Sequence, residues 1–218
     1  MDLYHYYLTQ KGRNIIKNQN YFPVYERHFS KFVGHPITMF EIGTGDGGSC
    51  QMWKYYFGPM AKIVTIDIQS LPQFNETQIF VCTGDQSDPV FLNGLIQEFG
   101  PPDIVLDDGS HLMKHINASF EVLFPQMSPK GVYLVEDLGG SYWPEYGGGF
   151  RHPDSFYERT KPLIDEMNAR YTSGAVKQSP YGRNIFGISY YLNMVVFDRS
   201  PFINWDMLRF PVPLPVPH

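Results

Sequence analysis

Acidic residues and one histidine follow two apolar runs in the middle of the chain. Leu106 precedes Asp107-Asp108-Gly109-Ser110-His111, and Val135 precedes Glu136-Asp137. If both runs are parallel strands of one sheet, their carboxyl ends meet at one edge and bring four carboxylates and an imidazole together. Four neighbouring anions are costly unless a cation neutralises them, and oxygen donors favour a hard divalent ion such as Mg²⁺. A neutral imidazole beside that ion could accept a proton from a hydroxyl group.

The two adjacent aspartates are expected to serve different partners. Successive side chains of a strand point to opposite sides, so one of Asp107 and Asp108 would face a cofactor and the other a metal and a substrate. Their order along the chain does not decide which. His111 lies three residues after Asp108 and can share its pocket. A helix-capping or surface role is the alternative for His111, but paired acids at two successive strand ends favour catalysis.

A glycine-rich loop lies upstream, between an apolar run and an amphipathic stretch. Its sequence is Glu41-Ile-Gly-Thr-Gly-Asp-Gly-Gly-Ser49. Glycines allow a ligand to approach the backbone closely, and the N–H groups that open the next helix face that ligand. Gly43, Gly45 and Gly48 have the GxGxxG spacing of nucleoside-cofactor sites, and Asp67 is placed to accept hydrogen bonds from ribose hydroxyls. NAD and S-adenosylmethionine both fit these features; a plain strand–helix turn is the alternative.

Other side chains around the loop favour S-adenosylmethionine. Glu41, two residues before Gly43, suits a cofactor with a cationic amino-acid end, and residues 41–53 contain no Arg or Lys that could hold a diphosphate. A further cluster, Gly84-Asp85-Gln86, follows another apolar run. Asp85 could accept a hydrogen bond from the adenine amino group, with an ordinary turn or cap role as the alternative.

These residues are positioned by an alternation of short apolar runs and amphipathic stretches. The runs are continuous and rich in Val and Ile, as in strands buried on both faces of a parallel sheet; they are Ile37–Ile42, Ile63–Ile68, Gln78–Cys82, Asp103–Leu106 and Val132–Val135. Helices are predicted over residues 47–57, 89–99 and 113–124. Two later runs, Ile185–Ile188 and Tyr190–Phe197, predict a terminal antiparallel pair. The sequence therefore predicts an α/β, doubly wound, mostly parallel sheet.

The chain divides into a main domain and two flanking segments. Residues 1–35 form a helical, aromatic N-terminal segment, residues 36–210 the domain, and residues 211–218 an extended Pro-rich tail. Within the domain, residues 138–153 combine five glycines with Tyr142, Trp143 and Tyr146, and we expect a long loop there that could act as a lid. Ser155 and Glu158 predict a helix start, and Pro162 is expected to kink or divide that helix.

Composition restricts the class of protein. The chain has 218 residues and a net charge of −5, which argues against nucleic acid as a partner. No stretch is long and apolar enough to span a membrane, and the first 11 residues do not resemble a signal peptide. Cys50 and Cys82 are too few for a disulfide scaffold, so a reduced, cytoplasmic setting is expected. The sequence leaves a homo-oligomer open.

Five motifs together resemble one enzyme family. EIGTGDGGS (41–49), IDI (66–68), GDQ (84–86), DDGSH (107–111) and VEDL (135–138) are similar to motifs of the metal-dependent sugar O-methyltransferases of macrolide biosynthesis and of the cephalosporin-hydroxylase-like group. Both belong to the class I S-adenosylmethionine-dependent methyltransferases. The resemblance covers about residues 21–170 and implies a Rossmann-like methyltransferase sheet.

The resemblance also implies a role for each site residue. It implies that Asp108, Glu136 and Asp137 bind Mg²⁺ or another divalent cation and that His111 is the base. Asp67 would hold the ribose of the cofactor and Asp107 would lie near its sulfonium. The adenine end would meet Asp85 and Gln86, and the methionine end would meet Glu41, Gly43 and Gly45.

The activity implied is methyl transfer to a hydroxyl of a sugar, glycan or other diol-bearing small molecule in natural-product biosynthesis. One alternative is an NAD-dependent oxidoreductase, which leaves the acid cluster unexplained. Another is a catalytically inactive nucleoside-binding or assembly protein that uses the Pro-rich tail as a docking arm.

Overall fold

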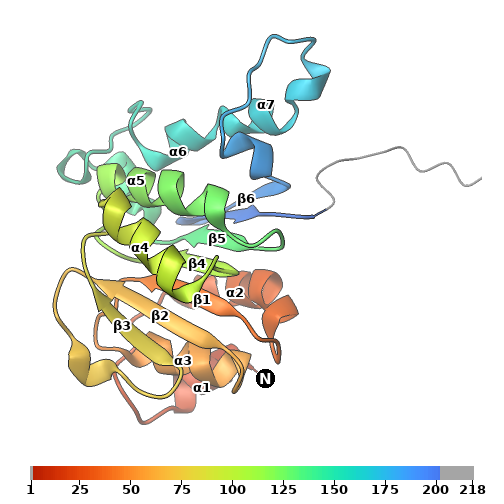
Figure 1. The fold of residues 1–218 in the computed structure, drawn as a ribbon. Coiled ribbons are helices and arrows are strands. Elements are labelled where there is room, and N and C mark those ends of the chain that lie inside the picture. The colour runs from red at the N-terminus through yellow and green to blue at the C-terminus, as the bar shows by residue number, and fades with distance from the viewer. Residues whose placement is uncertain (1, 202–218) are drawn as a thin grey trace, which may run out of the picture.

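A seven-stranded sheet forms the centre of the molecule in a computed structural model that describes residues 2–201. The strand order is β3-β2-β1-β4-β5-β7-β6 (Figure 1). The strands are β1 (Thr38–Ile42), β2 (Lys62–Asp67), β3 (Ile79–Thr83), β4 (Ile104–Asp107), β5 (Val132–Val135), β6 (Gly187–Tyr191) and β7 (Met194–Asp198). The first five are mutually parallel, β7 pairs antiparallel with β5, and β6 pairs antiparallel with β7. The predicted fold class is confirmed.

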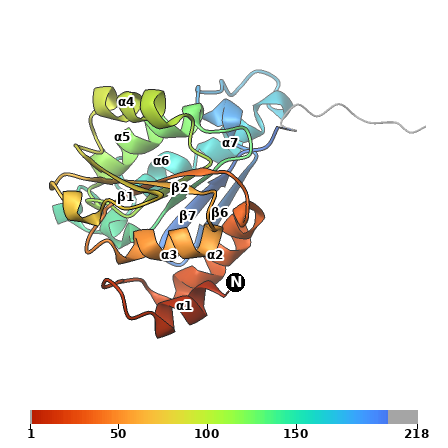
Figure 2. The same ribbon diagram turned by 60° about the horizontal axis from the view of Figure 1, so that its bottom comes forward.

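Helices cover both faces of the sheet (Figure 2). One layer contains α1 (Leu3–Thr9), α2 (Phe22–Phe29) and α3 (Gly48–Phe57), and the other contains α4 (Pro89–Phe99), α5 (Met113–Leu123), α6 (Phe156–Thr160) and α7 (Leu163–Met167). No helix within residues 2–201 has the length and apolar character needed to cross a membrane. The predicted tail, residues 211–218, lies outside the described residues.

Alternation along the strands divides the apolar side chains between two cores. In β5, Val132 and Leu134 pack with the α1–α3 layer, whereas Tyr133 and Val135 pack with the α4–α7 layer. Because each strand supplies side chains to both layers, it must be apolar on both faces. This requirement explains the continuous apolar runs in the sequence.

Local capping signals set several helix boundaries. The Asp88 side chain accepts a hydrogen bond from the Val90 N–H, Pro89 opens α4, and Gly100 follows its last residue. Ser155 caps α6 in the same way, and α7 begins directly after Pro162. These positions are the predicted ones, because caps, prolines and glycines act within a few residues.

The predicted terminal antiparallel pair is present, but its strands have different bounds from the predicted ones. The sequence suggested a break at Ser189, but Ser189 pairs with Val196 inside the β6–β7 ladder. The chain reverses instead at Leu192 and Asn193, where Asn193 has φ 65°. Asparagine tolerates this left-handed conformation, so it is a suitable turn residue. The turn lies beside the acid cluster described next.

Candidate active site

The acidic residues lie where the strand order reverses, between β1 and β4, and beside β5. β4 ends at Asp107 and β5 ends one residue before Glu136. In open α/β sheets this edge is the usual position of a ligand crevice. The topology therefore brings together residues that are far apart in the sequence.

Alternation sends three carboxylates to the face covered by α1–α3. Glu41 accepts a hydrogen bond from Trp53 Nε1 of α3 at 2.9 Å. Asp108 and Glu136 face the same layer, where both contact the N-terminal segment. Asp107 points to the opposite face and accepts a hydrogen bond from Ser119 Oγ of α5 at 2.6 Å. The expected division of the two aspartates between opposite sides is present.

A lysine from the N-terminal segment lies between two of these carboxylates. Lys17 Nζ is 2.5 Å from Asp108 Oδ2 and 2.6 Å from Glu136 Oε1. Its side chain is only 2% exposed. Burial alone would lower the pKa of Lys17, but the charges of Glu136 and Asp108 outweigh burial and raise it well above its ordinary value. Lys17 is therefore a buried ammonium group at neutral pH.

Helix α2 and the residues just before it supply further donors to the acids. Tyr25 donates its hydroxyl proton to Glu136, and Tyr21 donates to Asp137. The amide groups of Asn18 and Asn193 also donate to Asp137, at 3.2 and 3.1 Å. The N-terminal segment is thus part of the site and not only a cover for the sheet.

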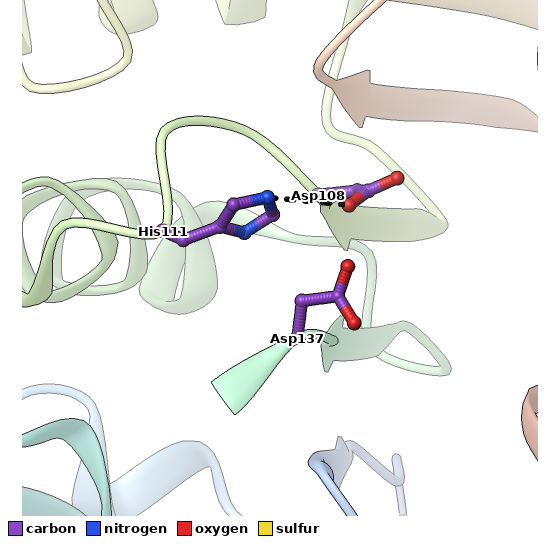
Figure 3. A group of neighbouring side chains, drawn as sticks. All are labelled: Asp108, His111 and Asp137. Atoms are coloured by element: carbon purple, nitrogen blue, oxygen red, sulfur yellow. Dashed lines mark ion pairs between the residues drawn. The ribbon is translucent and has the colours of Figure 1, made fainter. Parts of the chain in front are cut away.

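One group of side chains has the composition and spacing of a metal site. Ligand atoms of Asp108, His111 and Asp137 all lie within 4.8 Å of one another. Figure 3 shows the His111 ring pointing toward Asp108, with Nε2 4.0 Å from Asp108 Oδ1, and the Asp137 carboxylate facing the same space. Carboxylate oxygens with an imidazole nitrogen are suitable donors for a divalent cation. The residues present therefore fit the metal that the sequence predicts.

Two of these three residues have a strained backbone. His111 has φ 58° and Asp137 has φ 55°, in the left-handed region. Non-glycine residues in this region cost about 1–3 kcal/mol each and cluster at functional sites. Both side chains face the space beside Asp108 (Figure 3).

The structure places Glu136 beside this group and not within it. The Glu136 carboxylate is 1% exposed, and its two oxygens are held by Lys17 and Tyr25. Its role as a metal ligand stays a prediction, because in this arrangement the Lys17 ammonium group already binds one of its two oxygens.

Two cavities meet at Asp67, the predicted ribose-binding residue. One, of about 330 Å³, lies between the glycine loop and residues 14–17 and reaches Asp108. The other, of about 230 Å³, is lined by Asp85, Gln86 and His115 among others. Asp67 borders both cavities, and its Oδ2 accepts a hydrogen bond from the Thr44 N–H at 3.0 Å. This arrangement suits an elongated ligand with a central polar group.

Close packing explains why two positions of the loop are glycine. Gly43 has φ 97°, and a Cβ there would lie 2.1 Å from the Asp108 carbonyl oxygen. A Cβ on Gly48 would lie 2.2 Å from the carbonyl oxygen of Asn14. The loop therefore packs against both the end of β4 and the N-terminal segment. Gly45, with φ 50°, also lines the 330 Å³ cavity.

Asp85 and Gln86 organise the second cavity. Asp85 Oδ1 accepts hydrogen bonds from Ser87 N–H at 2.7 Å and Ser87 Oγ at 2.8 Å, and these bonds hold the pKa of Asp85 below its ordinary value. Gln86 donates to Asp107 at 3.1 Å and accepts from the Ser110 N–H at 2.8 Å. Gln86 thus ties its own loop to the one that carries His111.

Two predicted cofactor residues are buried away from both cavities. Glu41 is 0% exposed and is hydrogen-bonded to Trp53 and Cys50, and Asp107 is 1% exposed. Burial raises the pKa of both carboxyl groups. In this conformation neither touches the cavity surface, so both support residues that do; their direct contact with a cofactor stays a prediction. Glu41 accepts hydrogen bonds from Cys50 and Trp53 of α3, and Asp107 accepts one from Gln86.

A third cavity, of about 930 Å³, opens on the other side of Asp137. Its wall includes Gly139 and Tyr142 of the predicted lid, Tyr157 of α6, Tyr190 of β6, and Asn193. The Tyr157 ring lies 5.7 Å from that of Tyr142 and 6.3 Å from that of Tyr190. Trp143, another aromatic residue of the predicted lid, packs against Tyr146.

The sequence analysis did not identify Lys17, Asn18 or Tyr21 as site residues. All three precede the predicted domain, and their partners lie 91 or more positions away. One signal was available. Four carboxylates at one edge require positive charge, and a lysine of the chain can supply part of it.

Comparisons with known proteins agree with this geometry. No family model matches the sequence. The chain is 35% identical over 190 residues to mycinamicin VI 2''-O-methyltransferase of Micromonospora griseorubida, covering 82% of this chain and 47% of that protein. It is also 35% identical over 192 residues to 8-demethyl-8-alpha-L-rhamnosyl tetracenomycin-C 2'-O-methyltransferase of Streptomyces olivaceus, covering 82% of this chain and 50% of that protein.

A solved structure extends the similarity to three dimensions. MycE, the methyltransferase of mycinamycin biosynthesis in complex with Mg, SAH and mycinamycin VI, superposes with a TM-score of 0.79 at 33% identity over 91% of this chain and 52% of that chain. The chain has the class I methyltransferase fold. It spans about half the length of the relatives it matches.

Proposed function

We propose that this methyltransferase uses S-adenosylmethionine and Mg²⁺ to methylate a hydroxyl group of a sugar carried by a small molecule. The observation that supports this most directly is the position of Asp108, His111 and Asp137. Asp108 lines the 330 Å³ cavity beside Asp67, and Asp137 accepts hydrogen bonds from Asn18 and Asn193, which line the large tyrosine-lined cavity. The relatives named above are sugar O-methyltransferases, and the MycE complex contains Mg and SAH. NAD is not favoured, because these relatives and the acid cluster both indicate methyl transfer.

The paired cavities would hold the cofactor. S-Adenosylmethionine would supply an electrophilic methyl group. Asp67 would accept the ribose hydroxyls, because it borders both cavities. Asp85 and Gln86 would contact the adenine end, and Gly43 and Gly45 the methionine end.

The acid cluster would hold the metal and orient the acceptor. Asp108 and Asp137 would be ligands, with Glu136 as the third predicted one. Bound Mg²⁺ would lower the pKa of a coordinated hydroxyl group. His111 would receive the proton of that hydroxyl at a ring nitrogen, an effect worth about 10²–10⁴ in rate.

The 930 Å³ cavity would receive the acceptor. Tyr142, Tyr157 and Tyr190 give it flat apolar surfaces suited to a sugar ring or to its carrier. As part of this proposal, residues 138–153 act as the lid. We also infer a cytoplasmic location, in which Cys50 and Cys82 stay as the free thiols found here.

Calorimetry and methyl-transfer assays would test the proposal. S-Adenosylmethionine should bind and NAD should not, and binding should persist in chelator because neither the glycine loop nor Asp67 is among the residues that would hold the metal. Methyl transfer to glycosylated macrolides or to glycosylated aromatic polyketides should require a divalent cation. Asp67→Ala should weaken cofactor binding by roughly 10–100-fold, the loss of one charge-assisted hydrogen bond. Binding of NAD alone, or full turnover after exhaustive chelation, would contradict the proposal.

Two variants separate the role of the base from that of a ligand. His111→Ala should keep metal and cofactor binding while turnover falls about 10²–10⁴-fold, with partial recovery at high pH. Asp108→Ala should weaken metal binding itself, and excess metal should restore some activity. Wild-type turnover in His111→Ala would move the base to another residue, and His115 would be tested first.

A further inference from the structure

Lys17 has the position and the contacts of a cation that belongs to the acid cluster. Its ammonium group is within 2.6 Å of one oxygen each of Asp108 and Glu136, on the face of the sheet that Glu41 also occupies. At 2% exposure it has almost no contact with water. Among residues 2–201, Asp108 and Glu136 have no other lysine or arginine partner within ion-pair distance.

The charges around Lys17 do not balance without a further cation. When all three are ionised, Asp108, Glu136 and Asp137 carry three negative charges, and Lys17 supplies one positive charge. A buried carboxylate without a partner strongly destabilises a protein. When no metal is bound, Lys17 is the ion-pair partner of Asp108 and Glu136. A divalent cation at Asp108 and Asp137 would meet the rest.

In the same position, Lys17 would repel a metal ion bound at the acid cluster. Lys17 already binds Asp108, which is also a ligand in the group formed with His111 and Asp137. A divalent cation bound to Asp108 would therefore lie within a few ångströms of a buried ammonium group. Two cations that share one carboxylate in a site of low dielectric constant repel each other.

We propose that Lys17 is a resident cation of the metal site: it stabilises the acid cluster in the metal-free protein and lowers the affinity of that cluster for Mg²⁺. This inference rests on the proposed metal site at Asp108 and Asp137. Lys17 is a positioning residue, because it acts on the metal through the carboxylates. Its charge keeps the folded site intact before the metal arrives and makes metal binding reversible.

The test is Mg²⁺ binding by the full chain, measured by calorimetry, together with thermal unfolding in chelator and in saturating Mg²⁺. Lys17→Met removes the charge and keeps most of the side-chain volume. We expect Lys17→Met to bind Mg²⁺ about tenfold more tightly or better. We also expect a lower Tm in chelator and a larger rise in Tm with Mg²⁺ than for the wild type. Lys54→Met is the matched control, because Lys54 pairs with Glu76 on the outside of α3.

A second pair of variants covers the case in which Lys17→Met does not fold without metal. Glu136→Gln and the double variant Lys17→Met/Glu136→Gln leave Asp108, His111 and Asp137 in place. Replacing both members of a buried ion pair is often tolerated, whereas removing one member is not. The double variant should bind Mg²⁺ about tenfold more tightly than Glu136→Gln alone.

The outcomes distinguish this inference from the proposed function. If the wild type binds Mg²⁺ and removal of Lys17 leaves the affinity unchanged or lower in both backgrounds, the resident-cation role is wrong and the proposed metal site survives. If neither the wild type nor any Lys17 variant binds Mg²⁺, the metal site and the inference fail together. Tighter binding that appears only after removal of Lys17 would support the inference.

Discussion

Substitutions of Asp107 would show whether this residue supports its neighbours or contacts the cofactor directly. Its carboxylate accepts hydrogen bonds from Ser119 Oγ, Gln86 Nε2, the Gly109 N–H and Tyr133 Oη at 2.6, 3.1, 3.4 and 3.4 Å. Asp107→Ala would leave these donors without their acceptor. Ser119 can still donate to the Ile116 carbonyl at 3.0 Å, but Gln86 has no such alternative for its amide protons among its described hydrogen bonds.

The size of the effect follows from burial. An unsatisfied buried donor such as Gln86 costs about 1–3 kcal/mol, and the lost bond from Ser119 adds about 1 kcal/mol, so Asp107→Ala should destabilise the protein by roughly 2–4 kcal/mol. For a protein of this size each kcal/mol lowers Tm by about 2–4 °C, so a fall of roughly 5–15 °C is expected. Asp107→Asn should cost less, because it keeps the volume and one acceptor.

The two substitutions should also differ with pH. Burial raises the pKa of Asp107 above its ordinary value of 3.8, so the native state binds this proton more tightly than the unfolded state. This tighter proton binding stabilises the wild type at low pH, and the stabilisation is lost as pH rises from the unfolded pKa through the folded pKa. Asp107→Asn has no carboxyl group there and does not show this loss. The stability difference between the wild type and Asp107→Asn should shrink from pH 4 to neutrality.

Urea unfolding at several pH values and calorimetry with S-adenosylmethionine would measure both effects. Asp165→Asn, an exposed change on α7, is the control. Full stability of Asp107→Asn with cofactor affinity reduced more than tenfold would refute the reasoning, since Asp107 would then touch the cofactor directly.

Two further predictions concern the glycine loop and a half-buried thiol. Gly43→Ala should lower the free energy of unfolding by about 1–3 kcal/mol more than Gly58→Ala, because both have positive φ but a Cβ meets another atom within 4 Å only at Gly43. Equal losses in the free energy of unfolding of the two variants, measured by urea unfolding, would contradict the close packing at Gly43. Burial, with the charge of Glu98, raises the pKa of Cys82 to about 11. Its alkylation by iodoacetamide at pH 8, followed by mass spectrometry, should therefore be roughly 100-fold slower than that of a free thiol. A rate that stops rising near pH 9 would show an ordinary thiol.

The sequence predicted the elements whose signals are local. β5 has the predicted bounds, and so has α4, residues 89–99. Apolar runs bounded by caps and glycines carry this information within a few residues. The hairpin turn was misplaced because apolar and aromatic residues continue from β6 through Leu192 into β7 and do not mark where the chain reverses.

The site was only partly predictable, for a different reason. Asp108, His111 and Asp137 could be brought together on paper because strand ends of a parallel sheet share one edge. Lys17 could not, because its position depends on how a segment without a regular pattern packs across the finished sheet. The burial of Glu41 and Asp107 was also missed. Strand alternation predicts which face of the sheet a side chain lies on, but not how completely the helices cover it.

The contacts of Lys17 and Tyr21 also have a consequence for the order in which the chain folds. Lys17 and Glu136 are 119 residues apart, and Tyr21 and Asn193 are 172 apart. At synthesis rates of about 5–20 residues per second, the ammonium group is exposed for roughly 6–24 s before its second carboxylate is made. Contacts of such long range also form late in refolding. The acids at the ends of β4 and β5 can therefore meet ions of the surrounding solution before Lys17 reaches them, and the divalent-ion concentration during refolding should change how fast the N-terminal segment docks.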